Sequence, residues 1–212
     1  MKSVPEKNQG SGKKTAIFHL HFSGCKVQYY TPIFRKAEVI FMKVLSKQSN
    51  SRMCVICGLD NPSGVKAPFY NMEDGSVMSL FQFAPHHQSY PGRVHGGMIT
   101  AMLDEMGLRA MWANHGNEED FGVTLGLTAS FRKPVPYGED LIAKGVLLRE
   151  RSKFAVIRSQ IFSLDGTLLA EGEMKYLKLD PQVIAAGAVV HEEMPYRIQD
   201  GVTDIEFQSS KE

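Results

Sequence analysis

The sequence predicts an α+β fold in which antiparallel strands surround one long helix. Residues 97–112 contain no proline and place apolar side chains at helical spacing, whereas the flanking segments are short runs rich in aromatic and β-branched residues. The helix is apolar on nearly every face, which is typical of a buried helix rather than one that lies on a surface. One long helix among six strands excludes an alternating strand–helix architecture and favours the α+β class.

Each strand is bounded by turn residues. Two strands are expected before the helix, at 67–71 and 77–83, and the stretch Glu73-Asp74-Gly75-Ser76 between them predicts a hairpin turn. Gly116 and Asn117 end the helix. Four further strands are expected in an antiparallel meander, with the hairpin signal Asp165-Gly166 between the last two, at 121–132, 139–150, 153–164 and 167–179.

Composition and charge exclude several classes of protein. The chain has 212 residues, of which 43% are hydrophobic and 22% charged, so it is long enough to bury a core without disulfides. A net charge of +1 argues against a nucleic-acid binder, and no apolar run reaches the roughly 18 residues of a membrane-spanning helix. Three cysteines cannot form a disulfide framework, which favours a reducing, cytoplasmic location.

The charge pattern divides the chain into three parts. Residues 1–52 hold ten Lys or Arg and two acidic residues, and we expect a basic, flexible extension there. Such a segment also resembles a mitochondrial presequence but is poor in arginine, and a natural start at Met42 is an alternative. Residues 53–180 carry the predicted strands and helix, and 181–212 form a C-terminal tail without clear periodicity.

The start of the helix combines two features that suit a reactive site. Glycines at 92, 96 and 97 precede or open the helix, where free backbone N–H groups at the positive end of the helix dipole can bind an anion or oxyanion. Asp104 lies two turns later on the same stripe of small residues and has no partner within the helix. The alternative is a structural hydrogen bond or ion pair for Asp104 with a distant group. Glu105 and Arg109, on a neighbouring face, are expected to pair with each other.

The stretch 93–105, Arg-Val-His-Gly-Gly-Met-Ile-Thr-Ala-Met-Leu-Asp-Glu, resembles the signature helix of hotdog-fold acyl-CoA thioesterases of the PaaI-like and THEM-like group. The resemblance extends over residues 53–180. It implies a curved antiparallel sheet wrapped around one central helix, assembled as a homodimer or tetramer with sites at the subunit interface. It also implies hydrolysis of an acyl-CoA-type thioester, with coenzyme A as part of the substrate and no separate cofactor, nucleic acid or membrane partner.

The same resemblance implies roles for the catalytic residues. The backbone N–H of Gly96 would polarise the thioester carbonyl, and Asp104 of the other subunit would be the nucleophile or general base. Thr124, in the stretch 121–125, would orient water. His95 is a further catalytic candidate, for which the resemblance implies mainly a positional role.

Substrate-binding candidates surround this motif. Gly97 shares the helix start, and one branch of the family has an asparagine at the position of Ser89, with Gln88 beside it here. Arg132 and Lys133 end a predicted strand, and their side chains suit the phosphates of coenzyme A.

Two other features of the sequence have alternative interpretations. Cys54 and Cys57 form a single Cys-x-x-Cys, and a zinc site would need more ligands, for which His19 and His21 are candidates. We expect two reduced thiols and no metal. The alternative function is a non-catalytic module that binds or senses acyl-CoA, against which the acid at Asp104 argues, because a buried carboxylate does not help to bind an anionic ligand.

Overall fold

The computed structural model describes residues 15–22, 25–32, 38–184 and 190–209, in two compact units, Met1–Ala37 and Glu38–Glu212. In the first unit, β1 (Thr15–Phe22) and β2 (Cys25–Pro32) form an antiparallel hairpin. Residues 1–14 of the expected basic, flexible extension lie outside the described residues. Among the helices described, none combines the length and apolar character that crossing a membrane requires.

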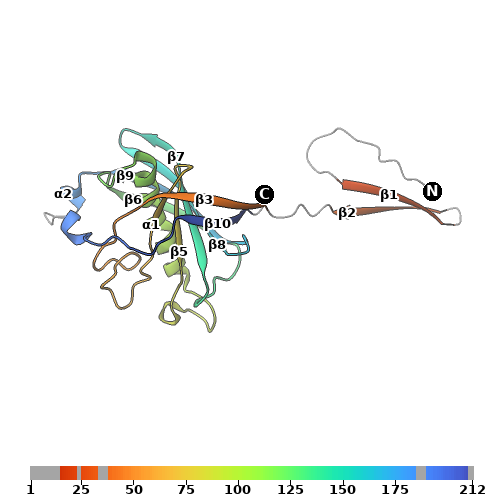
Figure 1. Cartoon of the computed structure of the whole chain (residues 1–212), viewed down its shortest axis with the longest axis horizontal. Coiled ribbons are helices and arrows are strands. Elements are labelled where there is room, and N and C mark those ends of the chain that lie inside the picture. Colours follow the sequence, from red (N-terminus) through yellow and green to blue (C-terminus); the bar gives the residue numbers. More distant parts are fainter. Residues whose placement is uncertain (1–14, 23–24, 33–37, 185–189, 210–212) are drawn as a thin grey trace. The chain divides into compact units, whose positions relative to one another are not determined.

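The second unit is an antiparallel sheet of eight strands with one long helix, α1 (Gly96–His115) (Figure 1). The strand order is β10-β3-β4-β5-β7-β8-β9-β6. The strands are β3 (Glu38–Lys47), β4 (Tyr70–Met72), β5 (Val77–Phe81), β6 (Gly122–Phe131), β7 (Leu141–Arg151), β8 (Phe154–Ser163), β9 (Leu168–Lys178) and β10 (Asp204–Ser209). Short helices occur at η1 (Pro85–His87), α2 (Pro181–Ile184) and η2 (Val190–Glu193).

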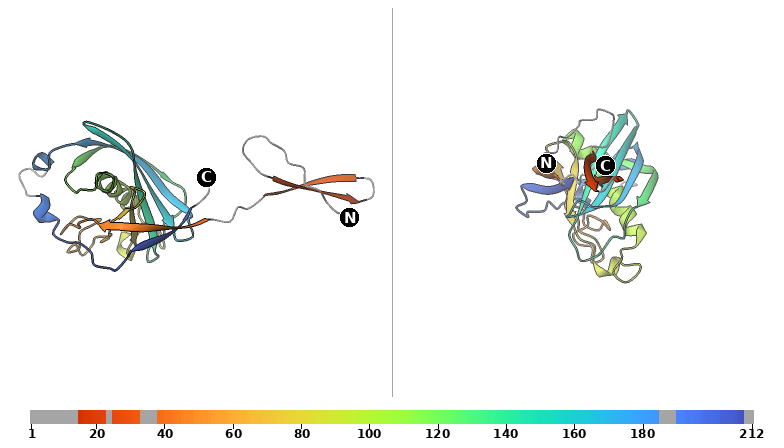
Figure 2. Two further views of the ribbon diagram at one scale, coloured as in Figure 1. Left: turned by 45° about the horizontal axis from the view of Figure 1, so that its top comes forward. Right: turned by 90° about the vertical axis from the view of Figure 1, so that its right-hand side faces the viewer.

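The sheet curves around α1, as Figure 2 shows in its left-hand view. The helix buries Met102, Leu103, Met106 and Ala110 completely, against strand residues such as Ile157 in β8. A helix enclosed in this way can be apolar on almost every face, which explains its composition. The expected α+β hotdog fold, with a curved antiparallel sheet around one central helix, is confirmed.

The order of the strands corrects the predicted meander. β7, β8 and β9 are consecutive neighbours, but β6 pairs with β9, whereas β7 pairs with β5. Pro134 and Pro136 lie in the connection between β6 and β7. Proline lacks the N–H that a hairpin ladder needs, so the chain crosses to another part of the sheet instead of turning back.

The folded unit also extends beyond the predicted range of 53–180. β3 lies within residues 1–52, and β10 lies within the predicted tail and pairs with β3. Met42 and Ile205 are register partners in these two strands, and both are buried. β3 lies in a basic stretch and β10 has only six residues, so neither shows a clear alternating pattern on its own. The boundary at residue 53 is therefore moved to Glu38.

Candidate active site

The start of α1 leaves one backbone donor free. His95 is the N-cap residue, and its Nδ1 accepts a hydrogen bond from the N–H of Gly97 at 2.9 Å. Among the described residues, none accepts from the N–H of Gly96. This donor lies at the positive end of the helix dipole, where it can stabilise developing negative charge. This geometry favours a positioning role for His95. Its Nδ1 already accepts the hydrogen bond from the N–H of Gly97, the residue that was expected to bind substrate.

A cavity of about 440 Å³ lies beside Gly96. Three of the expected substrate-binding residues, Ser89, Arg132 and Lys133, line it together with Gly96. The remaining lining residues are Tyr90, Arg93, Val94, Ile99, Phe131, Pro134 and Val135. The cavity thus combines apolar walls with three basic side chains. Gln88 does not line it, and its Oε1 instead accepts a hydrogen bond from the Tyr137 hydroxyl at 3.4 Å.

The Asp104 carboxylate is held by two hydroxyl groups. Thr124 Oγ1 donates to Asp104 Oδ1 at 2.7 Å, and the Tyr176 hydroxyl donates to the same oxygen at 2.8 Å. The Tyr176 hydroxyl also contacts the backbone carbonyl of Asp104. Within the described part of the chain, no group donates to Oδ2, and Asp104 is partly exposed. One oxygen is fixed, and the other is available to a reactant.

Tyr176 was not predicted from the sequence. It lies on β9, is almost completely buried, and is 72 residues from Asp104 in the chain. Burial, followed by the negative charge of Asp104, raises the pKa of the Tyr176 hydroxyl, which keeps it protonated as a donor. Gly107 gives the ring access to the helix, because a Cβ there would lie 2.4 Å from the Tyr176 hydroxyl oxygen. The stripe of small residues on α1 was the only sequence signal for such a close approach.

A bulge in β6 sets the position of Thr124. Thr124 pairs directly with Tyr176, but the next paired residue on β6 is Gly126, opposite Lys175. Leu125 is therefore the extra residue of the bulge. Bulges of this kind redirect neighbouring side chains and are frequent near active sites. Here the paired residues beside the bulge, Thr124 and Tyr176, both reach Asp104.

Gly96 and Asp104 cannot act on one substrate carbonyl within a single chain. They are separated by eight residues of α1, or ~12 Å at the helical rise of about 1.5 Å per residue. A thioester carbonyl and an attacking group must be about 3 Å apart. Within one chain, the Gly96 N–H and the Asp104 carboxylate are therefore too far apart to act on the same carbonyl.

A neighbouring face of α1 carries a second polar cluster. The predicted pair is present: Arg109 Nε lies 3.0 Å and Nη2 2.9 Å from Glu105 Oε1. Arg109 is fully buried and also donates to the carbonyl of Ser49 at 2.7 Å. Cys54 and Cys57 are free thiols, and Cys54 Sγ lies 3.8 Å from Glu105 Oε2. The spacing of the cysteines did not predict this link to the helix. No side chain is described for His19 or His21.

Comparison with known proteins agrees with this arrangement. Residues 91–170, which include the start of α1, Asp104 and Thr124, match the family model of the thioesterase superfamily. The match covers α1, β6, β7 and β8, and ends within the first residues of β9.

Two curated relatives and one solved structure are similar to part of this chain. The acyl-coenzyme A thioesterase THEM4 of Mus musculus is 31% identical over 118 residues, which cover 55% of this chain and 49% of the relative. THEM4 of Rattus norvegicus is 30% identical over 117 residues, covering 54% and 48%. The chain therefore spans about half the length of these relatives. A crystal structure of a thioesterase superfamily protein is 25% identical, with a TM-score of 0.54, covering 59% of this chain and 63% of that one.

Proposed function

We propose that this chain is an acyl-CoA thioesterase, which hydrolyses an acyl-CoA-type thioester to a carboxylic acid and a free thiol. The observation that carries the proposal is the state of Asp104: one carboxylate oxygen is fixed by Thr124 and Tyr176, and the other is free. The free N–H of Gly96 supplies the second requirement, a donor for the oxyanion. The match of residues 91–170 to the thioesterase superfamily and the similarity to the two THEM4 proteins support the same activity.

The chemistry requires no group beyond these residues and water. The Gly96 N–H polarises the thioester carbonyl and stabilises the negative oxygen of the tetrahedral intermediate. As a general base, Asp104 takes a proton from the attacking water; as a nucleophile, it attacks the carbonyl carbon and forms an anhydride, which water then hydrolyses. In both routes the C–S bond breaks, and the departing thiolate takes up a proton.

The ~12 Å between Gly96 and Asp104 leads us to place each reaction centre between two subunits. β6 ends the sheet, and no described strand pairs with its outer edge. Leu125 and Phe131 on β6 are 51% and 55% exposed. An open edge strand with exposed apolar side chains suits pairing with a second copy. The proposed assembly is a homodimer through β6, or a tetramer made of two such dimers.

The cavity beside Gly96 is the proposed entrance for coenzyme A. Arg93, Arg132 and Lys133 line it, and Arg and Lys bind phosphate groups well. Arg132 also pairs with Glu171 at 2.6 Å, which fixes its guanidinium at the rim. Tyr90 and Phe131 supply apolar area in the same cavity.

Thiol release from short, medium, long and aryl acyl-CoAs tests the proposal. Asp104→Asn keeps the shape of the side chain but removes the base or nucleophile, and we expect a rate loss of roughly 100- to 10,000-fold. Asp140→Asn, on an exposed loop, is the matched control and should retain activity. No turnover by the wild type, combined with tight binding of acyl-CoA, would favour the non-catalytic sensor. Turnover retained by Asp104→Asn would reject the mechanism.

The backbone donor can be tested by substitution as well. Gly96 is the first helical residue, where proline is well tolerated, and the extended conformation of His95 suits a residue that precedes proline. Gly96→Pro removes the N–H, and we expect kcat to fall about 100- to 1,000-fold. Gly96→Ala is the control, because it keeps the N–H and its Cβ would lie 3.6 Å from Phe131, an ordinary contact. Equal losses in both variants would count against the donor role.

Mixing the two inactive variants tests whether subunits share the site. In a dimer of one Asp104→Asn chain and one Gly96→Pro chain, one centre carries both lesions and the other carries none. After unfolding and refolding an equimolar mixture, random assembly should restore about a quarter of wild-type activity. Centres contained within single chains would give no recovery.

A further inference from the structure

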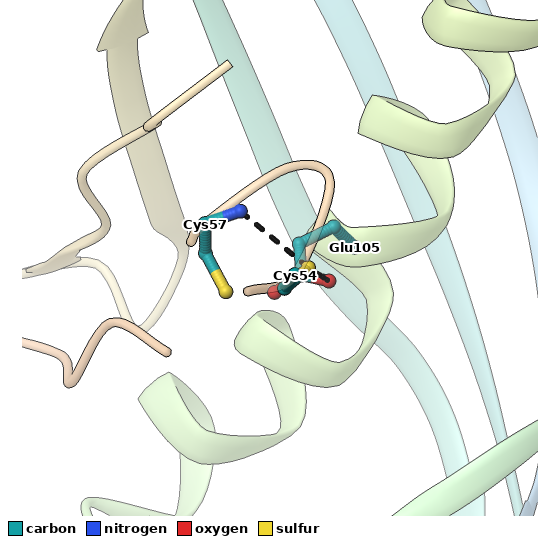
Figure 3. A group of neighbouring side chains, drawn as sticks. All are labelled: Cys54, Cys57 and Glu105. Carbon is teal, nitrogen blue, oxygen red and sulfur yellow. Dashed lines mark hydrogen bonds between the residues drawn. The ribbon is translucent and has the colours of Figure 1, made fainter. Parts of the chain in front are cut away.

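Cys54, Cys57 and Glu105 form a cluster that the proposed hydrolysis does not use. Their two sulfurs and one carboxylate oxygen all lie within 4.8 Å of one another. Figure 3 shows Glu105 extending from α1 toward the two cysteines of the preceding loop. Glu105 follows Asp104 in α1, so its side chain leaves the helix on a neighbouring face, about 100° away. The hydrogen bonds of the described residues do not join the cluster to Asp104, Thr124 or Tyr176.

The backbone around Cys54 is folded to surround a sulfur. The N–H groups of Ile56 and Cys57 approach Cys54 Sγ at 3.3 and 3.5 Å. The N–H of Gly58 donates to the carbonyl of Cys54 at 2.9 Å. A Cβ at position 58 would lie 2.4 Å from that carbonyl oxygen, so only glycine allows the turn to close. Two N–H donors on one sulfur favour its thiolate form, which is the form that binds metals.

Glu105 is oriented by Arg109. Both contacts of the guanidinium go to Oε1, at 3.0 and 2.9 Å, and Oε2 is left toward Cys54. A buried group that fixes one oxygen of a ligating carboxylate is a common feature around metal sites. Two thiolates and a carboxylate carry three negative charges, and Arg109 supplies one positive charge. A divalent cation would make the cluster neutral.

We propose that Cys54, Cys57 and Glu105 bind one Zn²⁺ ion, with water as the fourth ligand. Tetrahedral zinc with bonds of about 2.3 Å to sulfur and about 2.0–2.2 Å to oxygen places its ligand atoms roughly 3.5–3.8 Å apart. The separation of 3.8 Å between Cys54 Sγ and Glu105 Oε2 agrees with this value. Thiolate ligands select Zn²⁺ over Mg²⁺ or Ca²⁺. The ion would fasten the loop to α1 at the residue next to Asp104, and this inference does not depend on the proposed hydrolysis.

The test measures metal content and cobalt spectra of the full chain, purified under reducing conditions without chelator. We expect about one Zn²⁺ per chain, and Co²⁺ in its place should give sulfur-to-cobalt charge-transfer bands and the intense visible bands of tetrahedral coordination. Cys54→Ser and Cys57→Ser should lose both signals. Cys25→Ser, which changes the third cysteine, and Asp104→Asn, which changes the adjacent carboxylate, are the matched controls and should keep both.

Glu105→Gln is not a suitable test of metal binding, because it also leaves the buried Arg109 without its partner and destabilises the fold. The effect on folding is therefore measured separately from the effect on binding. Zn²⁺ should raise the melting temperature of the metal-free wild type but not that of Cys54→Ser, which keeps the Glu105–Arg109 pair. The proposal is overturned if the reduced wild type binds neither Zn²⁺ nor Co²⁺, or if Cys54→Ser binds as tightly as the wild type. It is also overturned if mass spectrometry of the native protein finds a Cys54–Cys57 disulfide and no metal.

Discussion

Thr124 and Tyr176 are opposite each other on β6 and β9, and their hydroxyls donate to the same oxygen of Asp104, at 2.7 and 2.8 Å. The carboxylate on the helix is thus oriented by two neighbouring strands of the sheet. Thr124 is exposed and Tyr176 is buried, so the pair connects the outer surface of the sheet edge to the core. Each of the two hydroxyls can be removed by a separate substitution.

Tyr176→Phe should lower kcat with little change in KM. The substitution keeps the buried ring but removes one hydrogen bond to the carboxylate, a type of bond worth about 1.5–3 kcal/mol, so we expect a loss of roughly 10- to 100-fold. Steady-state kinetics on an acyl-CoA substrate measures it. A phenylalanine variant with unchanged kcat would show that Tyr176 does not position Asp104.

Two substitutions at Thr124 distinguish the contribution of its hydroxyl to activity from that of its methyl group. Thr124→Val keeps the shape of the side chain and loses the donor to Asp104, so kcat should fall about 10-fold or more. Thr124→Ser keeps the donor and should retain most of the activity. Similar activity in the two variants would contradict a role for the hydroxyl. Both should fold normally, because Thr124 is exposed.

Gly107→Ala should destabilise the protein although alanine favours helices. The intrinsic gain of about 1 kcal/mol is outweighed because the new Cβ would lie 2.4 Å from the Tyr176 hydroxyl oxygen, and overpacking costs about 1–3 kcal/mol. Urea unfolding measures the difference. The control is Gly126→Ala on β6, where no heavy atom lies within 4 Å of the added Cβ. A Gly107→Ala variant as stable as the wild type would show that the ring moves without cost.

Arg132→Ala should impair the binding of coenzyme A thioesters but not of thioesters that lack the nucleotide. KM should rise several-fold for an acyl-CoA but remain unchanged for the same acyl group on N-acetylcysteamine, which lacks the nucleotide phosphates. Arg158→Ala, an exposed arginine on β8 that does not line the cavity, is the control. An equal rise for both substrates would place Arg132 in acyl-group binding instead.

His115 at the end of α1 should make stability depend on pH. Burial alone would lower its pKa, but hydrogen bonds to Glu150 and Asp120, both at 2.7 Å, more than offset this effect and raise the pKa. Lys178, 2.6 Å from Glu150, is the other charge in the cluster. Because the folded-state pKa is raised, the stabilisation is complete below the unfolded value of about 6.5 and is lost as the pH rises through the folded value.

His115→Gln should therefore lose more stability at about pH 5.5 than at about pH 9, by a difference on the order of 1 kcal/mol. Urea unfolding at the two pH values measures this difference. The same substitution at His86, which is exposed on η1, is the control. A loss that is equal at both pH values would mean that the charge of His115 does not stabilise the fold.

The sequence predicts a helix or strand well when its hydrophobic pattern is long and lies within one continuous segment. The helix was predicted over 97–112 and extends from Gly96 to His115, and the predicted strand at 153–164 is β8, Phe154–Ser163. Strand neighbours could not be read in the same way. A strand's alternation shows which face is buried but not which strand lies beside it, and so β6 was placed next to β7.

The candidate site was predictable where it is contiguous in the chain. Gly96 and Asp104 lie in one motif, and their helical stripe follows from spacing alone. Tyr176 could not be found in this way, because its contact with Asp104 depends on how β9 folds over α1, 72 residues away. The approach of Cys54 to Glu105, across 51 residues, has the same origin.

The distance between Gly96 and Asp104 along α1 has a consequence for kinetics. Under the proposed shared site, a correctly folded lone subunit is chemically inert, and turnover begins only when two chains meet. At extreme dilution the rate should therefore increase with the square of the protein concentration, and it should become linear once association is complete. A cell could then set the threshold for this activity through the amount of the protein alone.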